Sequence, residues 1–293
     1  MSITGPGAAD LFTEARPRLV GLAYRILGSL ADAEDVVSEV WFRWARTERA
    51  ALERPQAWLT TVTTRVALDH LRARKRRTAA YPGPWLPEPI IGEPGPDEVA
   101  ELADSLTLGF LILLDELGPV ERAVFVLAEV FAVPFDEIAE VVGKSSAACR
   151  QIASRARRRV QAADLPRASG SDRMLVDELL GAVAVGDIRG VLARLSPDVV
   201  YTADGGPHRR AARRPVETAP RVARLLVNLS RRYEGRMEVT PVTVNGDVGY
   251  VIAVDGTIDQ VLSCSVSDGR VSVIRNMRNP DKLQLVGTHH PLR

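Results

Sequence analysis

The sequence is poor in cysteine, histidine, lysine and aromatic residues, and it has no long apolar run. Its two cysteines, Cys149 and Cys264, lie far apart in a chain of 293 residues. This excludes a disulfide framework and favours buried thiols in a reducing compartment. No stretch approaches the roughly 18 uninterrupted apolar residues of a membrane span, and residues 1–10 lack a signal-peptide pattern. We therefore expect a cytoplasmic protein that does not enter a membrane.

The four histidines have no spacing suited to metal ligands with a partner acid. They are His70, His208, His289 and His290. No glycine-rich phosphate loop follows a predicted strand. The sequence therefore predicts no metal site, no cofactor and no convincing catalytic residue. What remains is ordinary globular composition, with 46% hydrophobic and 26% charged residues, over a length typical of two or three domains.

Arginine supplies nearly all of the 38 basic residues, because the only lysines are Lys75, Lys144 and Lys282. The formal net charge is +1, but the charges are unevenly distributed. Residues 54–77 and 141–167 each hold seven basic residues and one acidic residue, whereas residues 81–140 hold one basic residue and thirteen acidic residues. Two basic blocks that each end a helical pattern favour two nucleic-acid contacts. A solvated helix face is the alternative for either block taken alone.

Residues 1–80 predict an all-helical domain. Apolar spacing predicts one helix over residues 11–27 and a second helix that we expect Asp32 to cap. The second helix keeps its acidic residues outward from a stripe of valine and tryptophan. After a break at residues 47–55, a third helix runs into the basic residues 72–77.

Residues 81–96 predict a stiff, extended linker, because six prolines in sixteen residues forbid a helix. Its aromatic and aliphatic residues are unusual for a passive spacer. They are Tyr81, Trp85, Leu86, Ile90 and Ile91. We therefore expect the linker to dock on another part of the protein.

Residues 97–165 predict a second helical domain that contains a helix-turn-helix. A short helix after Pro134 is followed by Gly143, and then by two serines placed to cap a helix that we expect to reach Arg159. Helical spacing places inward Ile138, Cys149, Ile152, Ala153 and Ala156. The same spacing places outward Arg150, Gln151, Ser154 and Arg158, which suit base edges and phosphates. An αα-hairpin with a solvated basic face is the alternative.

Residues 171–293 predict a separate α+β domain, an antiparallel meander covered by helices in a cone-like arrangement. Helices are expected at residues 175–185, 188–195 and 216–229. Strands are expected at residues 199–201, 237–244, 249–254, 258–267 and 271–277. Asn-Gly or Asp-Gly pairs at residues 245–246, 255–256 and 268–269 favour hairpin turns between the last four strands.

Asp204, followed by Gly205 and Gly206, is the nearest approach to a catalytic site. A carboxylate beside two glycines at the mouth of a cone can act as a general base. The alternative is a turn in which the aspartate caps a neighbouring amide. No second titratable residue has a clear place beside it, which favours the turn.

Several segments together resemble the extracytoplasmic-function sigma factors. They are Asp32-Ala-Glu-Asp-Val-Val, Trp58-Leu with Leu68-Asp69-His-Leu-Arg72, Leu117-Gly-Pro-Val-Glu-Arg-Ala-Val-Phe-Val, Asp136-Glu-Ile-Ala and Ser154-Arg-Ala-Arg-Arg. This resemblance covers about residues 8–163 and matches regions 2 and 4 of the family. Three further segments are similar to the actinobacterial sigma-J subgroup, which has a fused C-terminal SnoaL-like, nuclear-transport-factor-like domain. They are Trp85-Leu-Pro-Glu-Pro89, Asp204-Gly-Gly206 and Asn279-Pro-Asp-Lys-Leu283.

The resemblance implies a role for each matching residue. Binding to the clamp of core RNA polymerase is implied for Asp32, Glu34, Asp35 and Glu39. Capture of a flipped base is implied for the loop 47–55. Reading of the −10 promoter element is implied for Arg65, Asp69, His70, Arg72, Arg74, Lys75 and Arg76. Reading of the −35 element is implied for Lys144, Ser145, Ser146, Arg150, Gln151, Ser154, Arg155 and Arg158. A regulatory or interdomain role is implied for Trp85, Pro87, Glu88, Asp204, Gly205, Gly206, Asn279, Asp281 and Lys282.

The sequence departs from the family's pattern at two places. Arg65 stands where many members carry asparagine, four residues before Asp69. Pro207 and His208 stand where the subgroup has a third glycine and a lysine after Asp-Gly-Gly. These departures bear on the −10 preference and on any ligand or regulatory role of the loop.

Our hypothesis is a transcription initiation factor that binds core RNA polymerase and promoter DNA, with residues 171–293 regulating it in cis. A small ligand or a regulatory protein is a possible partner of the C-terminal domain. Two alternatives stay open: a helix-turn-helix regulator that acts without polymerase, and a bifunctional protein with a catalytic SnoaL-like domain.

Overall fold

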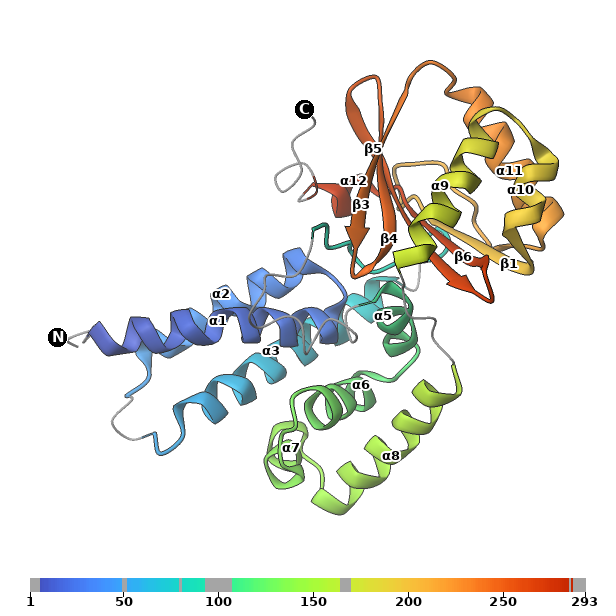
Figure 1. The fold of residues 1–293 in the computed structure, drawn as a ribbon. Coiled ribbons are helices and arrows are strands. Elements are labelled where there is room, and N and C mark those ends of the chain that lie inside the picture. The colour runs from blue at the N-terminus through green and yellow to red at the C-terminus, as the bar shows by residue number, and fades with distance from the viewer. Residues whose placement is uncertain are drawn as a thin grey trace. The chain divides into compact units, whose positions relative to one another are not determined.

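The computed structural model describes residues 6–48, 52–78, 81–92, 107–163, 170–284 and 286. The chain divides into two compact units (Figure 1). The N-terminal unit consists of residues 1–79 and 111–164, and the C-terminal unit of residues 80–110 and 165–293. The predicted linker therefore groups with the C-terminal residues, and residues 111–164 of the second predicted helical domain lie in one unit with the first.

The first part of the N-terminal unit contains, among its described residues, the helices α1 (Pro6–Leu27), α2 (Leu30–Arg46) and α3 (Pro55–Thr78). They pack against one another through buried apolar side chains. These include Leu19, Leu22, Ile26, Val36, Val40, Trp44, Leu59 and Leu71. The rings of Trp44 and Trp58 lie 5.6 Å apart between α2 and α3. The predicted helical character of this segment is confirmed.

The start of α2 differs from the sequence expectation, because Ser29 caps the helix and Asp32 does not. Ser29 has an extended backbone, and its Oγ accepts a hydrogen bond from the backbone N of Asp32 at 3.1 Å. Gly28, with a φ of 71°, turns the chain between α1 and α2 one residue earlier. Asp32 instead stands in the first turn of α2, where the helix dipole stabilises a carboxylate.

The second part of the N-terminal unit contains α6 (Pro119–Phe125), the short π-helix η2 (Val126–Val130), α7 (Phe135–Val142), α8 (Ser146–Ala162) and all but the first three residues of α5 (Leu108–Asp115). Gly143 adopts a φ of 66° between α7 and α8, and Ser145 caps α8 by accepting from the backbone N of Ala148. The helix-turn-helix prediction is confirmed here, although α8 continues three residues beyond Arg159. All five residues predicted to point inward are buried.

A six-stranded sheet forms the C-terminal unit, in the order β2-β1-β6-β5-β4-β3. Its strands are β1 (Leu195–Asp204), β2 (Val216–Glu217), β3 (Met237–Val244), β4 (Asp247–Val254), β5 (Thr257–Ser267) and β6 (Arg270–Met277). The predicted meander β3 to β6 is antiparallel, whereas β1 pairs parallel with β6. Positive φ values at Asn245, Asp255 and Asp268, each followed by glycine, confirm the three predicted hairpin turns.

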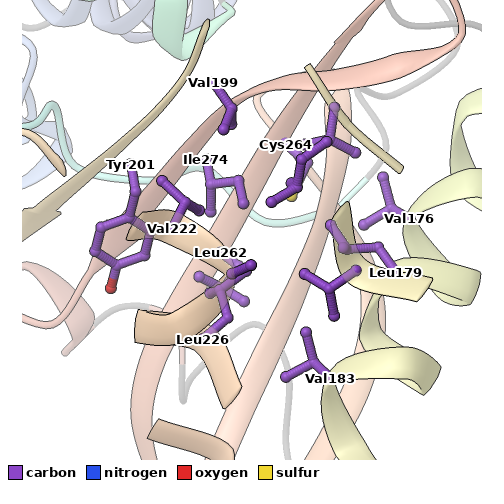
Figure 2. Packing of buried hydrophobic residues seen from close by; sticks show 14 of the residues in the cluster. Val176, Leu179, Val183, Val199, Tyr201, Val222, Leu226, Leu262, Cys264 and Ile274 are labelled. Carbon is purple, nitrogen blue, oxygen red and sulfur yellow. The ribbon is translucent and has the colours of Figure 1, made fainter. Parts of the chain in front are cut away.

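The described residues of the C-terminal unit form the helices α9 (Gly170–Ala184), α10 (Ile188–Arg194), α11 (Ala219–Arg232) and α12 (Pro280–Leu283). The helix predicted at residues 216–229 begins only at Ala219, because Val216 and Glu217 pair with β1 as a strand. The core lies between the sheet and the helices α9 and α11 (Figure 2). It includes Val176, Leu179, Val222, Leu226, Leu262 and Ile274.

No helix in the described part of the chain is long and apolar enough to cross a membrane. Within the same residues, no cluster of three or more histidine, cysteine, aspartate or glutamate side chains is placed to hold a metal ion.

Candidate functional site

The outward face of α8 carries the first candidate site. Five of the residues predicted to contact the −35 element line an open hollow of about 420 Å³ on this face. They are Arg150, Gln151, Ser154, Arg155 and Arg158. The guanidinium of Arg150 lies 5.7 Å from the ring centre of Phe135 on α7, which limits the freedom of that arginine. The face thus offers three cations and two neutral polar groups at helical spacing, a set suited to phosphates and base edges.

The N-terminus of α8 holds the remaining three residues of this predicted set, and each has a different environment. Ser145 is the N-cap, and the hydroxyl of Ser146 donates to Asp136 of α7. Lys144 is exposed just before the cap. The two serines therefore fix the turn of the helix-turn-helix, whereas Lys144 is available at its surface.

Arg157 stands on α8 but is held by the protein itself. Its Nε and Nη2 donate to the two carboxylate oxygens of Glu129 on η2, at 2.8 and 2.6 Å. These bonds raise the pKa of Arg157. The bidentate pair ties α8 to η2 and leaves the neighbouring arginines on the hollow face.

The acidic face of α2 is the second candidate site. Asp35 is exposed, whereas Asp32, Glu34 and Glu39 are partly buried. Glu34 is paired with Arg16, and Glu39 with Arg43 on its own helix. These pairs hold the carboxylates in place at the surface, where screening keeps their contribution to stability small.

Phe42 belongs to the same face of α2, although it is not among the residues predicted to bind polymerase. Its side chain is 62% exposed, and it lies one turn beyond Glu39. Aromatic residues, phenylalanine among them, are enriched at protein interfaces. The signal in the sequence was its position one turn from the outward acids, off the valine and tryptophan stripe.

The basic end of α3 is the third candidate site, and only part of the predicted set is exposed there. Arg72 and Arg76 are exposed, with Arg72 paired to Asp69 at 3.1 Å. His70 is partly exposed, and its Nε2 lies 3.7 Å from a carboxylate oxygen of Glu39. These residues form a polar surface along one side of the helix.

Arg65 is exposed on α3, yet its guanidinium contacts backbone in the second part of the unit. Its Nη2 donates to the backbone O of Glu140 at 2.8 Å, and its Nε to that of Val141 at 3.5 Å. These carbonyls lie at the C-terminal end of α7, where the helix dipole favours a cation. Arg65 would have to leave them before it could contact DNA.

The structure corrects the prediction for Arg74 and Lys75, which do not belong to an open DNA surface. Arg74 is 8% exposed and donates to Asp115 at 2.7 Å and to the backbone O of Leu27. Lys75 donates to the backbone O atoms of Asp115 and Leu117, both at 2.9 Å. The physical reason is helical geometry: position 74 follows 67 and 71 along the buried stripe of α3.

Asp115 also accepts from Nη1 of Arg122 at 2.9 Å, so one carboxylate serves two buried arginines. Arg122 is fully buried, and burial lowers its pKa to about 10. Burial likewise lowers the pKa of Arg74. This cluster joins α3, α5 and α6 and is structural.

The fourth candidate site is a cluster around Asp204, which we call the latch. It consists of Tyr81, Trp85, Leu86, Asp204, Gly206, Asn279 and Lys282. Asp204 is 0% exposed and accepts from Lys282 Nζ at 2.7 Å, from the backbone N of Leu86 at 2.9 Å and from that of Gly206 at 2.9 Å. The Tyr81 hydroxyl also donates to it, at 2.5 Å. Each of these four groups donates a hydrogen bond to the carboxylate.

Lys282 closes the latch from the C-terminal side. Its ammonium lies 4.0 Å from the ring centre of Trp85 and also donates to the backbone O of Leu86. Asn279 caps α12 by accepting from the backbone N of Asp281, and its Nδ2 donates to the Tyr81 hydroxyl at 3.0 Å. Burial and the bond to Asp204 raise the pKa of Tyr81. Asp281 itself is exposed, and His208 lies 3.8 Å from it.

The two glycines after Asp204 are required by close approaches. A Cβ at Gly205 would lie 2.3 Å from the backbone O of Arg209. Gly206 has a φ of 58°, and a Cβ there would lie 2.5 Å from the side chain of Asn279. The Asp-Gly-Gly motif is thus a tight turn that places Asp204 for the latch.

The rest of the linker follows the end of β3. The backbone N and O of Ile90 bond to the side-chain Oδ1 and backbone N of Asn245, both at 2.9 Å, and Ile91 forms an antiparallel bridge with Val244. Pro87 and Glu88 are buried. Docking of the linker is confirmed over residues 81–92, whereas residues 93–96 lie outside the described part. The local sequence at Asn245 predicts only a turn, because a contact with the distant linker leaves no signal in neighbouring residues.

Comparison with known proteins supplies a framework for these sites. Residues 11–77 match the family described as Sigma-70 region 2, and residues 110–160 match Sigma-70, region 4. The chain is 38% identical over 286 residues to the ECF RNA polymerase sigma factor SigJ of Mycobacterium tuberculosis, covering 92% of this chain and 91% of the relative. It is 29% identical over 275 residues to the probable sigma factor SigI of the same organism, covering 92% of each. The crystal structure of SigJ superposes with a TM-score of 0.76 at 36% identity, covering 97% of this chain and 100% of the other.

Proposed function

The chain belongs to the extracytoplasmic-function sigma factors, and on this premise we propose that its C-terminal unit regulates transcription initiation in cis through the latch. As a sigma factor it binds core RNA polymerase and promoter DNA. We assign residues 1–80 to region 2, 81–96 to the linker, 97–165 to region 4 and 171–293 to the SnoaL-like regulatory domain. We expect the protein in the cytoplasm, where it would meet core polymerase.

We assign the surfaces of this sigma factor by their chemistry. The acidic face of α2, together with Phe42, is the contact with core polymerase. The exposed residues Arg72 and Arg76 of α3, with Asp69 and His70, contact the −10 element, and Arg65 joins them if it leaves α7. The hollow face of α8, with Lys144, contacts the −35 element.

One observation carries the regulatory proposal: residues 81–92 of the connection between α3 and α5 are bonded to the C-terminal unit. When two DNA-binding parts are joined by a tether, binding of the first raises the effective concentration of the second at its own site. This happens only if the tether is long enough to span both sites. A docked tether has fewer conformations and a shorter reach than a free one. The latch therefore controls how regions 2 and 4 can be placed on a promoter.

The experiment is run-off transcription with purified core polymerase and three proteins. They are the full chain, residues 1–166, and the Lys282→Gln variant. We expect promoter output to change at least twofold in both altered proteins. The matched control is Arg236→Gln, which removes a cation of the same domain from an exposed pair with Asp255. Output that is equal in all four proteins would refute regulation by the latch, and no initiation by any of them would favour a regulator independent of polymerase.

The contacts of Asp204 also argue against a catalytic role for this residue. A general base needs an oxygen that can reach a substrate proton. Both oxygens of Asp204 already accept two hydrogen bonds each, in a site with no exposed surface. We infer that it is a structural residue of the latch. Turnover of any compound in a substrate screen that is lost on Asp204→Asn, with the fold intact, would contradict this.

A further inference from the structure

The C-terminal unit contains two adjoining hollows that neither the latch nor the proposed DNA contacts use. They have volumes of about 280 and 100 Å³. They share four lining residues, Tyr201, Leu229, Tyr233 and Arg278. No residue of the docked linker lines either of them. We call the two hollows together the cone pocket.

The smaller hollow is apolar over most of its wall. Its lining includes Leu180, Val183, Leu226, Met237, Ile252 and Leu262, from α9, α11 and the sheet. Figure 2 shows Leu226 and Leu262 facing one another between the helices and the sheet, with the ring of Tyr201 beside them. A space of this kind takes an apolar group out of water.

The larger hollow is strongly cationic. Arg209, Arg210, Arg232 and Arg278 line it, and none of the described residues that line either hollow is acidic. Asp259 pairs with Arg209 at 3.4 Å and with Arg278 at 2.7 Å. Among the described residues, Arg210 and Arg232 have no carboxylate partner. Four guanidinium groups around one hollow, with one carboxylate between them, favour an anion.

Two buried polar atoms on residues that line the hollows lack a hydrogen-bond partner in the described part of the chain. Asn276 is 2% exposed, and its Nδ2 donates to Tyr201 at 2.8 Å and to Gln260 at 2.7 Å, whereas its Oδ1 has no partner among the described residues. The Nε of Arg278 is buried without a partner in the same part of the chain. Buried polar groups in proteins are normally satisfied, so these two indicate a site built for an occupant.

We propose that the cone pocket binds a small amphipathic carboxylate. Its apolar body lies among the leucines of the smaller hollow, and its carboxylate lies against the arginines of the larger one. The planar fork of arginine matches a carboxylate with two parallel hydrogen bonds. The proposal goes beyond regulation by the latch and does not depend on it, because it concerns binding alone.

The test is isothermal titration calorimetry on the full chain with three probes. Sodium decanoate carries both features, decan-1-ol has the apolar body without the charge, and acetate has the charge without the body. We expect decanoate to bind at least tenfold more tightly than either of the others. Failure of decanoate to bind at millimolar concentration would overturn the proposal. Equal affinity for decanol would also overturn it, since the arginines would then contribute nothing.

Two double variants with equal charge test whether the pocket is the site. Arg210→Gln/Arg232→Gln removes two lining cations that are exposed and unpaired to acids, so the fold is retained. Arg221→Gln/Arg224→Gln removes two exposed cations of α11 that line neither hollow. We expect decanoate affinity to fall about tenfold in the first variant only. Equal affinities in the two variants would place the binding elsewhere and refute the assignment.

Discussion

The ammonium of Lys282 lies 2.7 Å from the carboxylate of Asp204, and both side chains are buried although 78 positions separate them in the chain. Loss of one partner leaves an uncompensated buried charge, which costs about 3–5 kcal/mol. Lys282→Gln should therefore lower the free energy of unfolding of the C-terminal unit by that order, as measured by urea denaturation. The control is the exposed ion pair between Arg236 and Asp255. Removing its cation by Arg236→Gln should leave the free energy of unfolding nearly unchanged. Similar losses in the two variants would show that the latch does not stabilise the unit.

Gly205→Ala should destabilise the same unit, because the new Cβ would lie 2.3 Å from the backbone O of Arg209. Backbone cannot move away as a flexible side chain can, and we expect a loss of about 2 kcal/mol or more. Gly181→Ala is the matched control. Gly181 lies within α9 with open space around it, and alanine there should be neutral or stabilising by up to about 1 kcal/mol. Thermal unfolding of the two variants checks the contrast, and equal melting temperatures would contradict it.

Asp115→Asn should destabilise the N-terminal unit. The change leaves Arg74 and Arg122 buried beside a neutral amide. We expect the free energy of unfolding to fall by about 2–4 kcal/mol. This is less than for a fully buried pair, because the side chain of Asp115 is 32% exposed. Asp69→Asn, which removes an exposed carboxylate from a pair with Arg72, is the control and should have little effect. Denaturant unfolding followed by helical circular dichroism measures both. A small effect at Asp115 would mean that solvent replaces the carboxylate.

The stability of the C-terminal unit should depend on pH through Asp247. Burial raises the pKa of this carboxyl to about 6, although Arg275 lowers it in part. A carboxyl whose pKa is raised on folding stabilises the fold fully below its ordinary pKa of about 4, and that contribution disappears as the pH rises through about 6. Between pH 4 and pH 6 the free energy of unfolding should therefore fall by about 2 kcal/mol. Asp247→Asn should remove this part of the pH dependence, and identical slopes for variant and wild type between pH 4 and 7 would refute the assignment.

Arg150→Gln should weaken binding of the holoenzyme to promoter DNA about tenfold, because a guanidinium on the hollow face of α8 is lost. Arg159→Gln is the control: Arg159 is exposed on the same helix but does not line the hollow. Fluorescence anisotropy with DNA selected by the holoenzyme from a randomised pool measures both affinities. Equal losses would mean that α8 acts only through its overall charge.

Local pattern predicted most of the fold. The apolar stripes of α2 and α8, the turn at Gly143 and the three hairpins of the sheet were all predicted from residue spacing and turn chemistry. These features depend on neighbours within a few positions, so sequence alone is sufficient for them. The same holds for the outward polar face of α8, since helical geometry fixes which side chains share a face.

Long-range contacts decided what the sequence could not. A run of basic residues at 72–77 is continuous in sequence, yet only the tertiary structure separates the exposed Arg72 and Arg76 from Arg74, which pairs with Asp115. Asp204 could be a base or a turn residue until Lys282, Tyr81 and Leu86 were found around it. Composition and spacing determined the helices, the hairpins and the distribution of charge. Which charges face solvent and which are neutralised in the interior depends on partners tens of residues away, because burial and ion pairing are properties of the packed chain.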